Sequence, residues 1–245
     1  MPAFFIASSD IHGTDITLTG NLCHHLRASL RIRPGEYLWF TDEQRRRYRV
    51  TVMEVKPERI LARIVDRLDG PVESGPAMLL AQALLKGDHM DWVVQKASEL
   101  GVRTIVPVIA QHGIVRPQAG RIAAQVSRWQ RIAEEAAQQS EQWQAPCILE
   151  PMEFRRFIPQ AAATTSLILA ERRETVGLST IPLPSLVSES VSLLIGPEGG
   201  WAGEEIAMAM AQGSHAVSLG KYILRAETAA LAAITIVQSR LGRLG

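Results

Sequence analysis

The stretch "LLIGPEGGWAGEEI", residues 193–206, joins an apolar run directly to a turn and then to a helix-like pattern. Three glycines and a proline fall within five positions of that turn, and glycine permits backbone angles and close approaches that other residues disfavour. An apolar strand, a shaped turn and a helix in immediate succession are typical of one step of a parallel α/β sheet. Ligands of such sheets lie beyond the carboxyl ends of the strands, where this turn is expected.

The acidic residue in the turn indicates which ligands it suits. Glu198 would repel an anion, no Gly-Lys-Ser/Thr follows, and the dinucleotide pattern GxGxxG is absent, so a phosphate site is disfavoured. An acidic loop rich in backbone groups better suits a ligand with hydroxyls, an amine or a positive centre. The alternative is a turn that merely connects strand and helix, because glycine-rich turns of this kind are common.

The rest of the chain after residue 72 repeats the same strand-helix rhythm. Apolar runs at 77–84, 104–109, 166–170 and 191–196 alternate with helical patterns at 89–101, 121–142, 203–213 and 227–242. Strands that alternate with helices predict an α/β fold with a mostly parallel sheet covered on both faces.

The first 72 residues have a different pattern. Short apolar runs at 3–6, 37–40, 47–55 and 59–68 are separated by turn signals, with one expected helix at 21–30. In the run 47–55, Met53 interrupts an alternation of valines with polar residues. This spacing predicts a small β-barrel or sandwich, with residues 69–76 as a linker. We therefore expect two domains, 1–72 and 73–245.

Composition limits the possible functions. The chain has 245 residues, 47% of them hydrophobic, and a formal net charge of +1, which argues against a general polycation but not against a local basic face. Cys23 and Cys147 form no metal-binding spacing, so we expect no metal and read both as buried, reduced thiols of a cytoplasmic protein. The N-terminus lacks the features of a signal peptide, and the late apolar run 229–237 is about half of a membrane span, so no membrane partner is expected.

A second stretch, "VSLGKYILRAETAALAAIT" at 217–235, carries further candidate residues. Arg225 lies between an apolar pair and a buried-looking helix, where a guanidinium needs a partner or a substrate; a solvated surface arginine is the alternative. Glu227 falls near the start of that helix, where a carboxylate is favourable in any case.

At these residues the sequence resembles a known family. GPEGG before an acidic helix, followed about twenty residues later by LGxxILRxETA, is similar to the RsmE-type 16S rRNA uridine N3-methyltransferases of the SPOUT superfamily. The resemblance covers essentially the whole chain. It includes "HHLRASLRIRPGE" (24–36), through His25, Leu30, Arg31 and Gly35, and "KGDHMDWVVQKASELGV" (86–102), through Lys86, Met90, Lys96, Glu99, Leu100 and Gly101.

The resemblance implies a fold, a cofactor and an assembly. It implies a SPOUT methyltransferase domain with a C-terminal trefoil knot, which the general rule against knots would have excluded, preceded by a PUA-like β-barrel. It implies that three loops hold S-adenosylmethionine through Leu169, Glu171, Gly196, Pro197, Glu198, Gly199, Gly200, Leu219, Gly220, Ile223, Leu224 and Arg225. It also implies a homodimer with the active site at the subunit interface.

The implied reaction assigns roles to the charged residues. Methylation at uracil N3 requires loss of the imide proton, so Arg225 is expected to stabilise the anionic uracil oxygens. Either Glu198 or Glu227 would take the proton or orient the base, and the sequence does not separate them. Residues 21–50 contain seven arginines and three acids. We expect 16S rRNA, within the small ribosomal subunit, to contact His25, Arg31, Arg33, Arg45, Arg46 and Arg47; a solvated strand edge is the alternative.

The sequence departs from the family pattern in two places. Gln111 and His112 replace a Glu-Arg pair, and Gln138 and Gln142 replace an acid and an arginine of the long helix. These changes affect the expectation for the target nucleotide more than the expectation for the cofactor. Two other classes therefore stay open: another SPOUT enzyme that methylates a ribose 2′-oxygen or a tRNA base, and a non-catalytic RNA-binding protein of the same fold.

Overall fold

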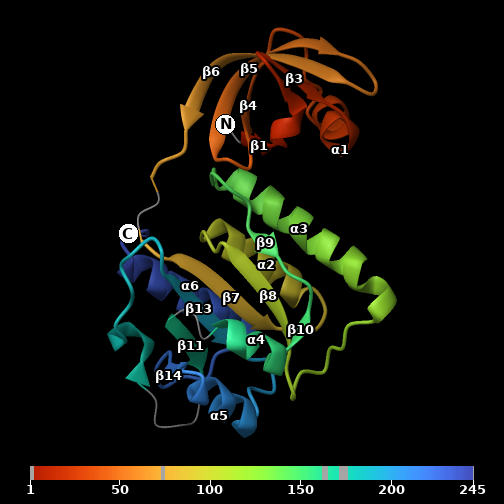
Figure 1. Cartoon of the computed structure of the whole chain (residues 1–245). Coiled ribbons are helices and arrows are strands. Elements are labelled where there is room, and N and C mark those ends of the chain that lie inside the picture. Colours follow the sequence, from red (N-terminus) through yellow and green to blue (C-terminus); the bar gives the residue numbers. More distant parts are fainter. Residues whose placement is uncertain (1–2, 73–74, 162–164, 171–175, 245) are drawn as a thin grey trace. The chain divides into compact units, whose positions relative to one another are not determined.

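The computed structural model describes residues 3–72, 75–161, 165–170 and 176–244. The chain divides into two compact units (Figure 1). The first unit comprises Met1–Val72 together with Ala137–Ala145, and the second comprises Glu73–Ala136 and Pro146–Gly245. A short segment from the middle of the chain therefore belongs to the N-terminal unit, which the pattern of apolar runs did not indicate.

The first unit is built on a six-stranded mixed sheet in the order β1-β4-β5-β6-β3-β2. The strands are β1 (Ala3–Phe5), β2 (Ile11–His12), β3 (Asp15–Leu18), β4 (Tyr37–Thr41), β5 (Arg46–Val55) and β6 (Ile60–Asp69). The pair β1–β4 is parallel and the other recorded pairs are antiparallel. Helix α1 (Gly20–His24) continues into a wider turn at His25–Ser29, at the place where the sequence predicted a helix.

The irregular position Met53 has a structural cause. The register of β5 against β6 shifts between Val52 and Glu54, which is a β-bulge. The bulge leaves Met53 44% exposed, whereas Val50 and Val52 are buried. The break in the alternating pattern therefore marks a bulge and not the end of the strand.

Arg47 joins the 137–145 segment to the sheet of the first unit. Its guanidinium lies 4.0 Å from the centre of the Trp143 ring and donates hydrogen bonds to the backbone carbonyls of Glu141 and Gln142, at 3.2 and 3.1 Å. It also donates to the Thr41 hydroxyl. Burial lowers the pKa of Arg47. These contacts give the arginine a structural role.

The second unit contains an eight-stranded sheet in which every recorded pair is parallel. The order is β10-β8-β7-β13-β11-β14-β12, and β9 also pairs with β8. The strands are β7 (Ala77–Ala83), β8 (Thr104–Ile109), β9 (Cys147–Ile148), β10 (Met152–Glu153), β11 (Thr165–Leu169), β12 (Val176–Gly177), β13 (Ser190–Ile195) and β14 (His215–Ser218). The expected parallel α/β sheet is therefore present.

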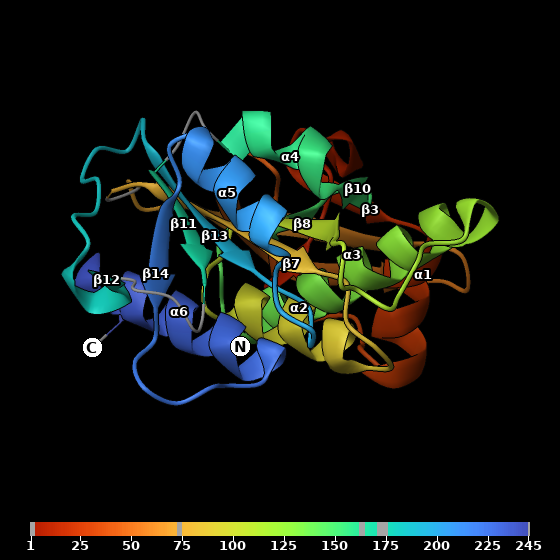
Figure 2. The ribbon, with the colours of Figure 1, turned by 90° about the horizontal axis from the view of Figure 1, so that it is seen from below.

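Helices cover both faces of this sheet. They are α2 (His89–Glu99), α3 (Ile122–Gln139), α4 (Phe154–Ala161), α5 (Gly203–Ala211) and α6 (Ala226–Arg240). Figure 2 shows α4 and α5 on one side of the sheet and α2 and α6 on the other. The helix predicted at 121–142 ends three residues earlier, and α4 was not predicted.

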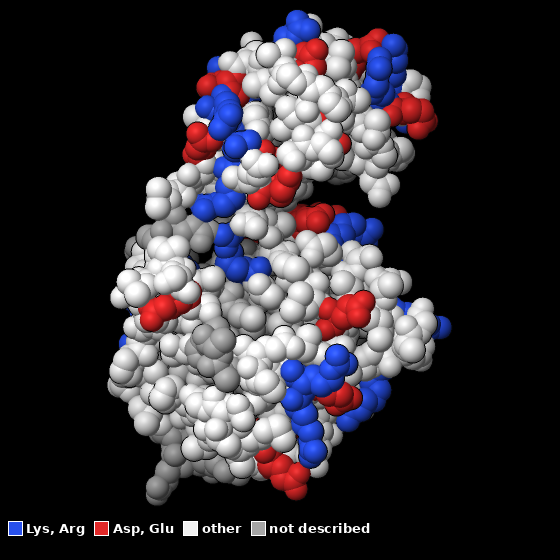
Figure 3. All heavy atoms as spheres, viewed as in Figure 1, with Lys and Arg blue, Asp and Glu red and all other residues white. Residues whose placement is uncertain are grey.

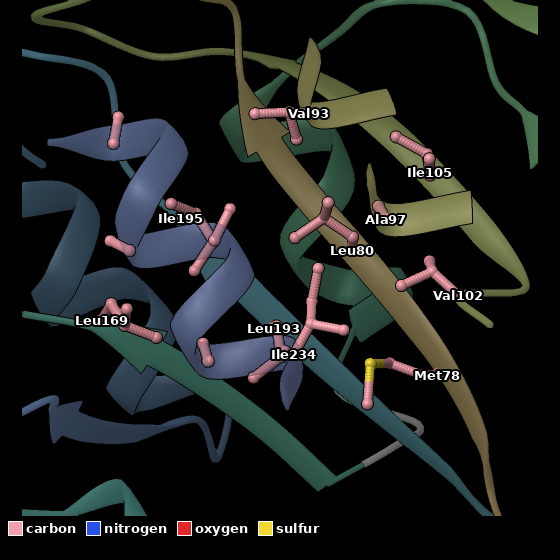
Figure 4. Close-up of a cluster of buried hydrophobic side chains, with 14 of the residues drawn as sticks. Met78, Leu80, Val93, Ala97, Val102, Ile105, Leu169, Leu193, Ile195 and Ile234 are labelled. Carbon is pink, nitrogen blue, oxygen red and sulfur yellow. The ribbon is translucent and has the colours of Figure 1, made fainter. Parts of the chain in front are cut away.

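Two apolar clusters hold the layers together. Leu80, Leu193 and Ile195 point from the sheet toward α2 and α6, where they meet Val93, Ile234 and their neighbours (Figure 4). On the opposite face, Ala81 and Leu194 pack against the buried side chains of α4 and α5. The strands are apolar on both faces because both faces are covered.

The two cysteines differ in exposure. Cys23 is buried, as expected, but Cys147 is exposed. Cys147 lies on the two-residue strand β9, where the next residue, Ile148, points inward; side chains alternate along a strand, so the thiol points outward. The prediction of a buried Cys147 is therefore wrong. Within the described residues, no helix combines the length and the apolar character that crossing a membrane requires.

Candidate active site

A pocket of about 580 Å³ lies at the carboxyl ends of β11 and β13 in the second unit. Its walls come from the end of β11, the loop that follows β13, the segment before α6 and the first residues of α2 and α6. The lining residues are His89, Leu169, Ala170, Ile195, Gly196, Pro197, Glu198, Gly199, Gly200, Trp201, Ile206, Ile223, Leu224, Arg225, Ala226, Glu227 and Ala229. The structure therefore brings the two distant sequence motifs, GPEGG and ILRAE, to one cavity.

The glycines of the loop after β13 have different structural reasons. Gly200 has φ of +71°, which other residues rarely adopt. A Cβ on Gly196 would lie 3.3 Å from the Trp201 ring. A Cβ on Gly199 would lie 3.1 Å from the Cβ of His112 and 3.2 Å from its carbonyl oxygen. A side chain at Gly196 or Gly199 would thus require a neighbouring protein group to shift.

Glu205 anchors the loop that follows β13. The side chain is 6% exposed and accepts hydrogen bonds from the backbone N–H of Gln111 at 2.8 Å and of Ala202 at 2.9 Å. It thereby connects the start of α5 to the loop that follows β8. Sequence reasoning missed this role, although a glutamate three residues after the N-cap position is a recognised capping signal.

Glu198 is held by the turn that precedes α2. Its Oε1 accepts a hydrogen bond from the backbone N–H of Lys86 at 3.2 Å, while the side chain stays exposed. In the same turn, the backbone N–H of His89 donates to the Lys86 carbonyl. Glu198 therefore links two loops of the pocket.

Glu227 and His89, which both line the pocket, are in contact. The Glu227 Oε1 lies 3.3 Å from the His89 Nδ1, and the side chains are 14% and 44% exposed. Arg225 lies just before α6, where its carbonyl accepts the N–H of Ala229, and its side chain is exposed at the pocket. His89 was not among the predicted site residues, because its contact with Glu227 joins segments far apart in the sequence.

Two predicted cofactor-binding residues lie elsewhere. Leu219 and Gly220 are not among the pocket-lining residues. Leu219 instead packs against the core on the α2 and α6 face. Glu171 lies outside the described residues. The remaining nine predicted residues all line the pocket.

The predicted RNA-binding residues all lie in the first unit. His25, Arg31 and Arg33 are exposed, and Arg46 is half-buried. Arg45 donates to the Pro71 carbonyl at 2.8 Å, and Arg47 makes the internal contacts described above. On the face shown in Figure 3, acidic side chains lie beside the basic ones of this unit.

Comparison with known proteins agrees with this geometry. The model of a family described as an RNA methyltransferase domain matches residues 73–238. A ribosomal RNA small subunit methyltransferase E from Synechocystis is 30% identical over 96% of this chain and 77% of its own length. The chain belongs to the RsmE-type RNA methyltransferases. Solved structures of RsmE-type and related proteins share the architecture of both units.

Two of these structures contain S-adenosylmethionine. A ribosomal RNA small subunit methyltransferase E from Neisseria gonorrhoeae, bound to S-adenosyl methionine, is 33% identical and superposes with a TM-score of 0.86 over 98% of both chains. A methyltransferase from Legionella pneumophila, in complex with the same cofactor, is 29% identical with a TM-score of 0.88, again over 98% of both chains. The RsmE-type fold of this chain thus extends over both units.

Proposed function

We propose that the protein transfers a methyl group from S-adenosylmethionine to N3 of a uridine in 16S rRNA. The observation that carries this proposal is the convergence of the GPEGG loop and the ILRAE segment on one pocket at the strand ends. The names of the relatives support ribosomal RNA of the small subunit as the substrate. The choice of uridine N3 rests on the chemistry of the pocket residues together with the RsmE-type membership.

The residues of the pocket fit the proposed cofactor. The cavity is of the size that encloses a small-molecule ligand. Gly196, Gly199 and Gly200 leave backbone groups accessible, while Leu169, Ile195 and Leu224 supply apolar surface for an adenine ring. Two carboxylates, Glu198 and Glu227, suit a ligand that carries an amine and a sulfonium. When bound, the cofactor supplies an electrophilic methyl group.

The same pocket suits a base that becomes an anion. Arg225 is the guanidinium in the described pocket wall, and because it would repel the positive sulfonium we assign it to the nucleic-acid side. Helices α2 and α6 begin at pocket-lining residues, His89 and Ala226, and helix N-termini carry partial positive charge. Both features stabilise uracil oxygens as N3 loses its proton.

The wider architecture follows from the same proposal. The strand order β7-β13-β11-β14, in which successive loops return to one pocket, supports a trefoil knot in the C-terminal part of the second unit. The mixed sheet of the first unit is proposed as a PUA-like RNA-binding domain, with His25, Arg31 and Arg33 as its exposed contacts. We further propose a homodimer that acts on 16S rRNA of the small subunit in the cytoplasm.

One experiment tests the function. Small ribosomal subunits from cells that lack this protein would be incubated with the purified protein and S-adenosylmethionine, and the methylated nucleotide would be mapped by mass spectrometry. The expected product is one 3-methyluridine in 16S rRNA. A methyl group on a ribose oxygen or on another base would overturn the proposed reaction, and cofactor binding without any product would favour a non-catalytic RNA-binding role.

A further inference from the structure

The contact between His89 and Glu227 supports an assignment that neither the sequence motifs nor the relatives provide. We propose that His89 is the general base that removes the N3 proton of the target uracil, and that Glu227 orients it. This inference rests on the proposed uridine N3 methylation.

The geometry of the pair determines which nitrogen is available. Glu227 is 14% exposed, and its Oε1 lies 3.3 Å from His89 Nδ1. A carboxylate this close to Nδ1 favours the tautomer that carries its proton on that nitrogen. The Nε2 atom is then left with its lone pair. His89 is 44% exposed and lines the pocket, so an entering base can reach it.

The backbone around His89 gives the two glutamates different tasks. His89 is the first residue of α2, and its N–H donates to the Lys86 carbonyl. The N–H of Lys86 in turn donates to the Glu198 carboxylate at 3.2 Å. Glu198 therefore anchors the turn that carries His89, and Glu227 sets the orientation of the ring. This arrangement separates two residues that the sequence left as equivalent candidates for the base.

The proton balance of the step is simple. The N3–H bond of uracil breaks, and the proton forms a bond to His89 Nε2. The N3 electron pair then forms the bond to the donated methyl group, and the electrons of the broken carbon–sulfur bond stay on the donor sulfur. The Glu227 carboxylate stabilises the imidazolium while it exists, and the partly exposed ring returns its proton to water.

Other charged groups near His89 come from three elements. Glu227 and Arg225 line the same pocket from the start of α6, and Glu198 lines it from the loop after β13. On its own helix, Asp91 is engaged by Arg128 and by the Trp129 indole N–H at 3.0 Å, and Asp88 is exposed in the preceding turn. Among these groups, Glu227 is the carboxylate that contacts the imidazole.

The test is a pH–rate profile of single-turnover methylation on small ribosomal subunits from cells lacking the protein. We compare the wild type with His89→Ala and His89→Asn, because asparagine keeps an N–H donor toward Glu227 but carries no base. Both variants should lose about 10²- to 10⁴-fold in rate, and the bend of the wild-type profile should disappear from theirs. Added imidazole should restore part of the rate of the alanine variant.

Controls separate this role from a structural one. Cofactor affinity, measured by calorimetry, should stay within about threefold of the wild type in both variants. His215→Asn, an exposed histidine on β14 outside the pocket lining, should keep the wild-type profile. If either His89 variant forms 3-methyluridine at the wild-type rate, or keeps the bend, this assignment is overturned while the proposed function stands. If the wild-type product is not 3-methyluridine, the proposed function fails and the assignment fails with it.

Discussion

Gly199 lies directly against His112, so that a Cβ on the glycine would be 3.1 Å from the Cβ of the histidine. His112 is one of the two residues in the loop after β8 that depart from the family pattern. The loop after β8 therefore packs against the GPEGG loop. The requirement for glycine at position 199 therefore comes from a protein neighbour, whereas the sequence motif alone suggested close approach of a ligand.

Substitution of Gly199 should weaken cofactor binding through a displaced loop. Gly199→Ala forces the loop or His112 to move by a few tenths of an ångström, and Gly199→Val forces a larger shift because of its branched side chain. We expect S-adenosylmethionine affinity to fall by about tenfold for alanine and to be lost for valine, while both proteins stay folded by circular dichroism. Gly120→Ala, where no atom lies within 4 Å, is the control and should bind normally. Unchanged affinity in Gly199→Val would remove this loop from the binding site.

Removal of the Glu205 carboxylate should affect both stability and binding. Glu205→Ala leaves the backbone N–H groups of Gln111 and Ala202, of which that of Ala202 is buried, without their acceptor, at a cost of about 1–3 kcal/mol in the free energy of unfolding. Cofactor affinity should also fall, because the loop loses its anchor. Glu204→Ala is the matched control, since that neighbouring side chain is 78% exposed and 4.0 Å from Arg155. Equal stability of the two variants by urea denaturation would contradict the anchoring role.

Loss of Arg225 should slow the reaction more than it weakens cofactor binding. The guanidinium is exposed at the pocket, so Arg225→Ala should keep the fold and most cofactor affinity. A preorganised contact to developing negative charge is worth about 10²–10³ in rate. We expect a loss of that size in single-turnover methylation, and partial recovery in Arg225→Lys because a point charge does not reproduce the planar fork. Near-normal turnover by the alanine variant would refute the role.

Arg47 should stabilise the first unit independently of the cofactor site. Arg47→Ala removes the contact with the Trp143 ring and two hydrogen bonds to backbone carbonyls, which together are worth about 1–3 kcal/mol. The free energy of unfolding should fall by this amount, with unchanged S-adenosylmethionine affinity. Arg67→Ala, which breaks an exposed ion pair with Asp69, should lower the free energy of unfolding far less than Arg47→Ala does. If Arg47→Ala lowers the free energy of unfolding as little as Arg67→Ala does, Arg47 does not hold the 137–145 segment in place.

The dimer proposal has a direct test. Helix α6 leaves Leu231, Ala232 and Ile236 half-buried in the single chain, and Trp92 on the adjacent helix α2 is 42% exposed. Such surface favours a partner of the same kind. Light scattering at micromolar concentration should give twice the chain mass. A monomer that still methylates RNA at the same concentration would contradict the proposal.

Local patterns predicted most elements of the second unit, because its longer strands and most of its helices show clear apolar runs or periodicity. Gly101, with φ of +77°, follows α2 as expected of a helix terminator. Helix α4 was missed although Phe154, Phe157, Ile158 and Ala161 share one face, because the segment is short and contains Pro159. Strands β2 and β3 were missed because runs of two and four residues carry little periodicity.

The site was predictable where motifs are contiguous and not where contacts join distant segments. GPEGG and ILRAE identified most of the pocket lining. His89, Glu205 and the packing of His112 on Gly199 depend on the order of strands in the sheet, which no local pattern encodes. The RNA-binding expectation for Arg45 and Arg47 rested on charge density, and the structure commits these side chains to carbonyl groups of the first unit.

The inclusion of Ala137–Ala145 in the first unit has a consequence for dissecting the protein. Because α3 (Ile122–Gln139) runs from the second unit into the first, the chain passes between the units three times. No single cut releases either unit intact. A fragment of residues 1–72 would lack Trp143 and the carbonyl groups that bind Arg47. A fragment of residues 73–245 would carry the segment 137–145 without the sheet against which that segment packs. Chimaeras made with relatives should therefore exchange residues 1–72 and 137–145 together.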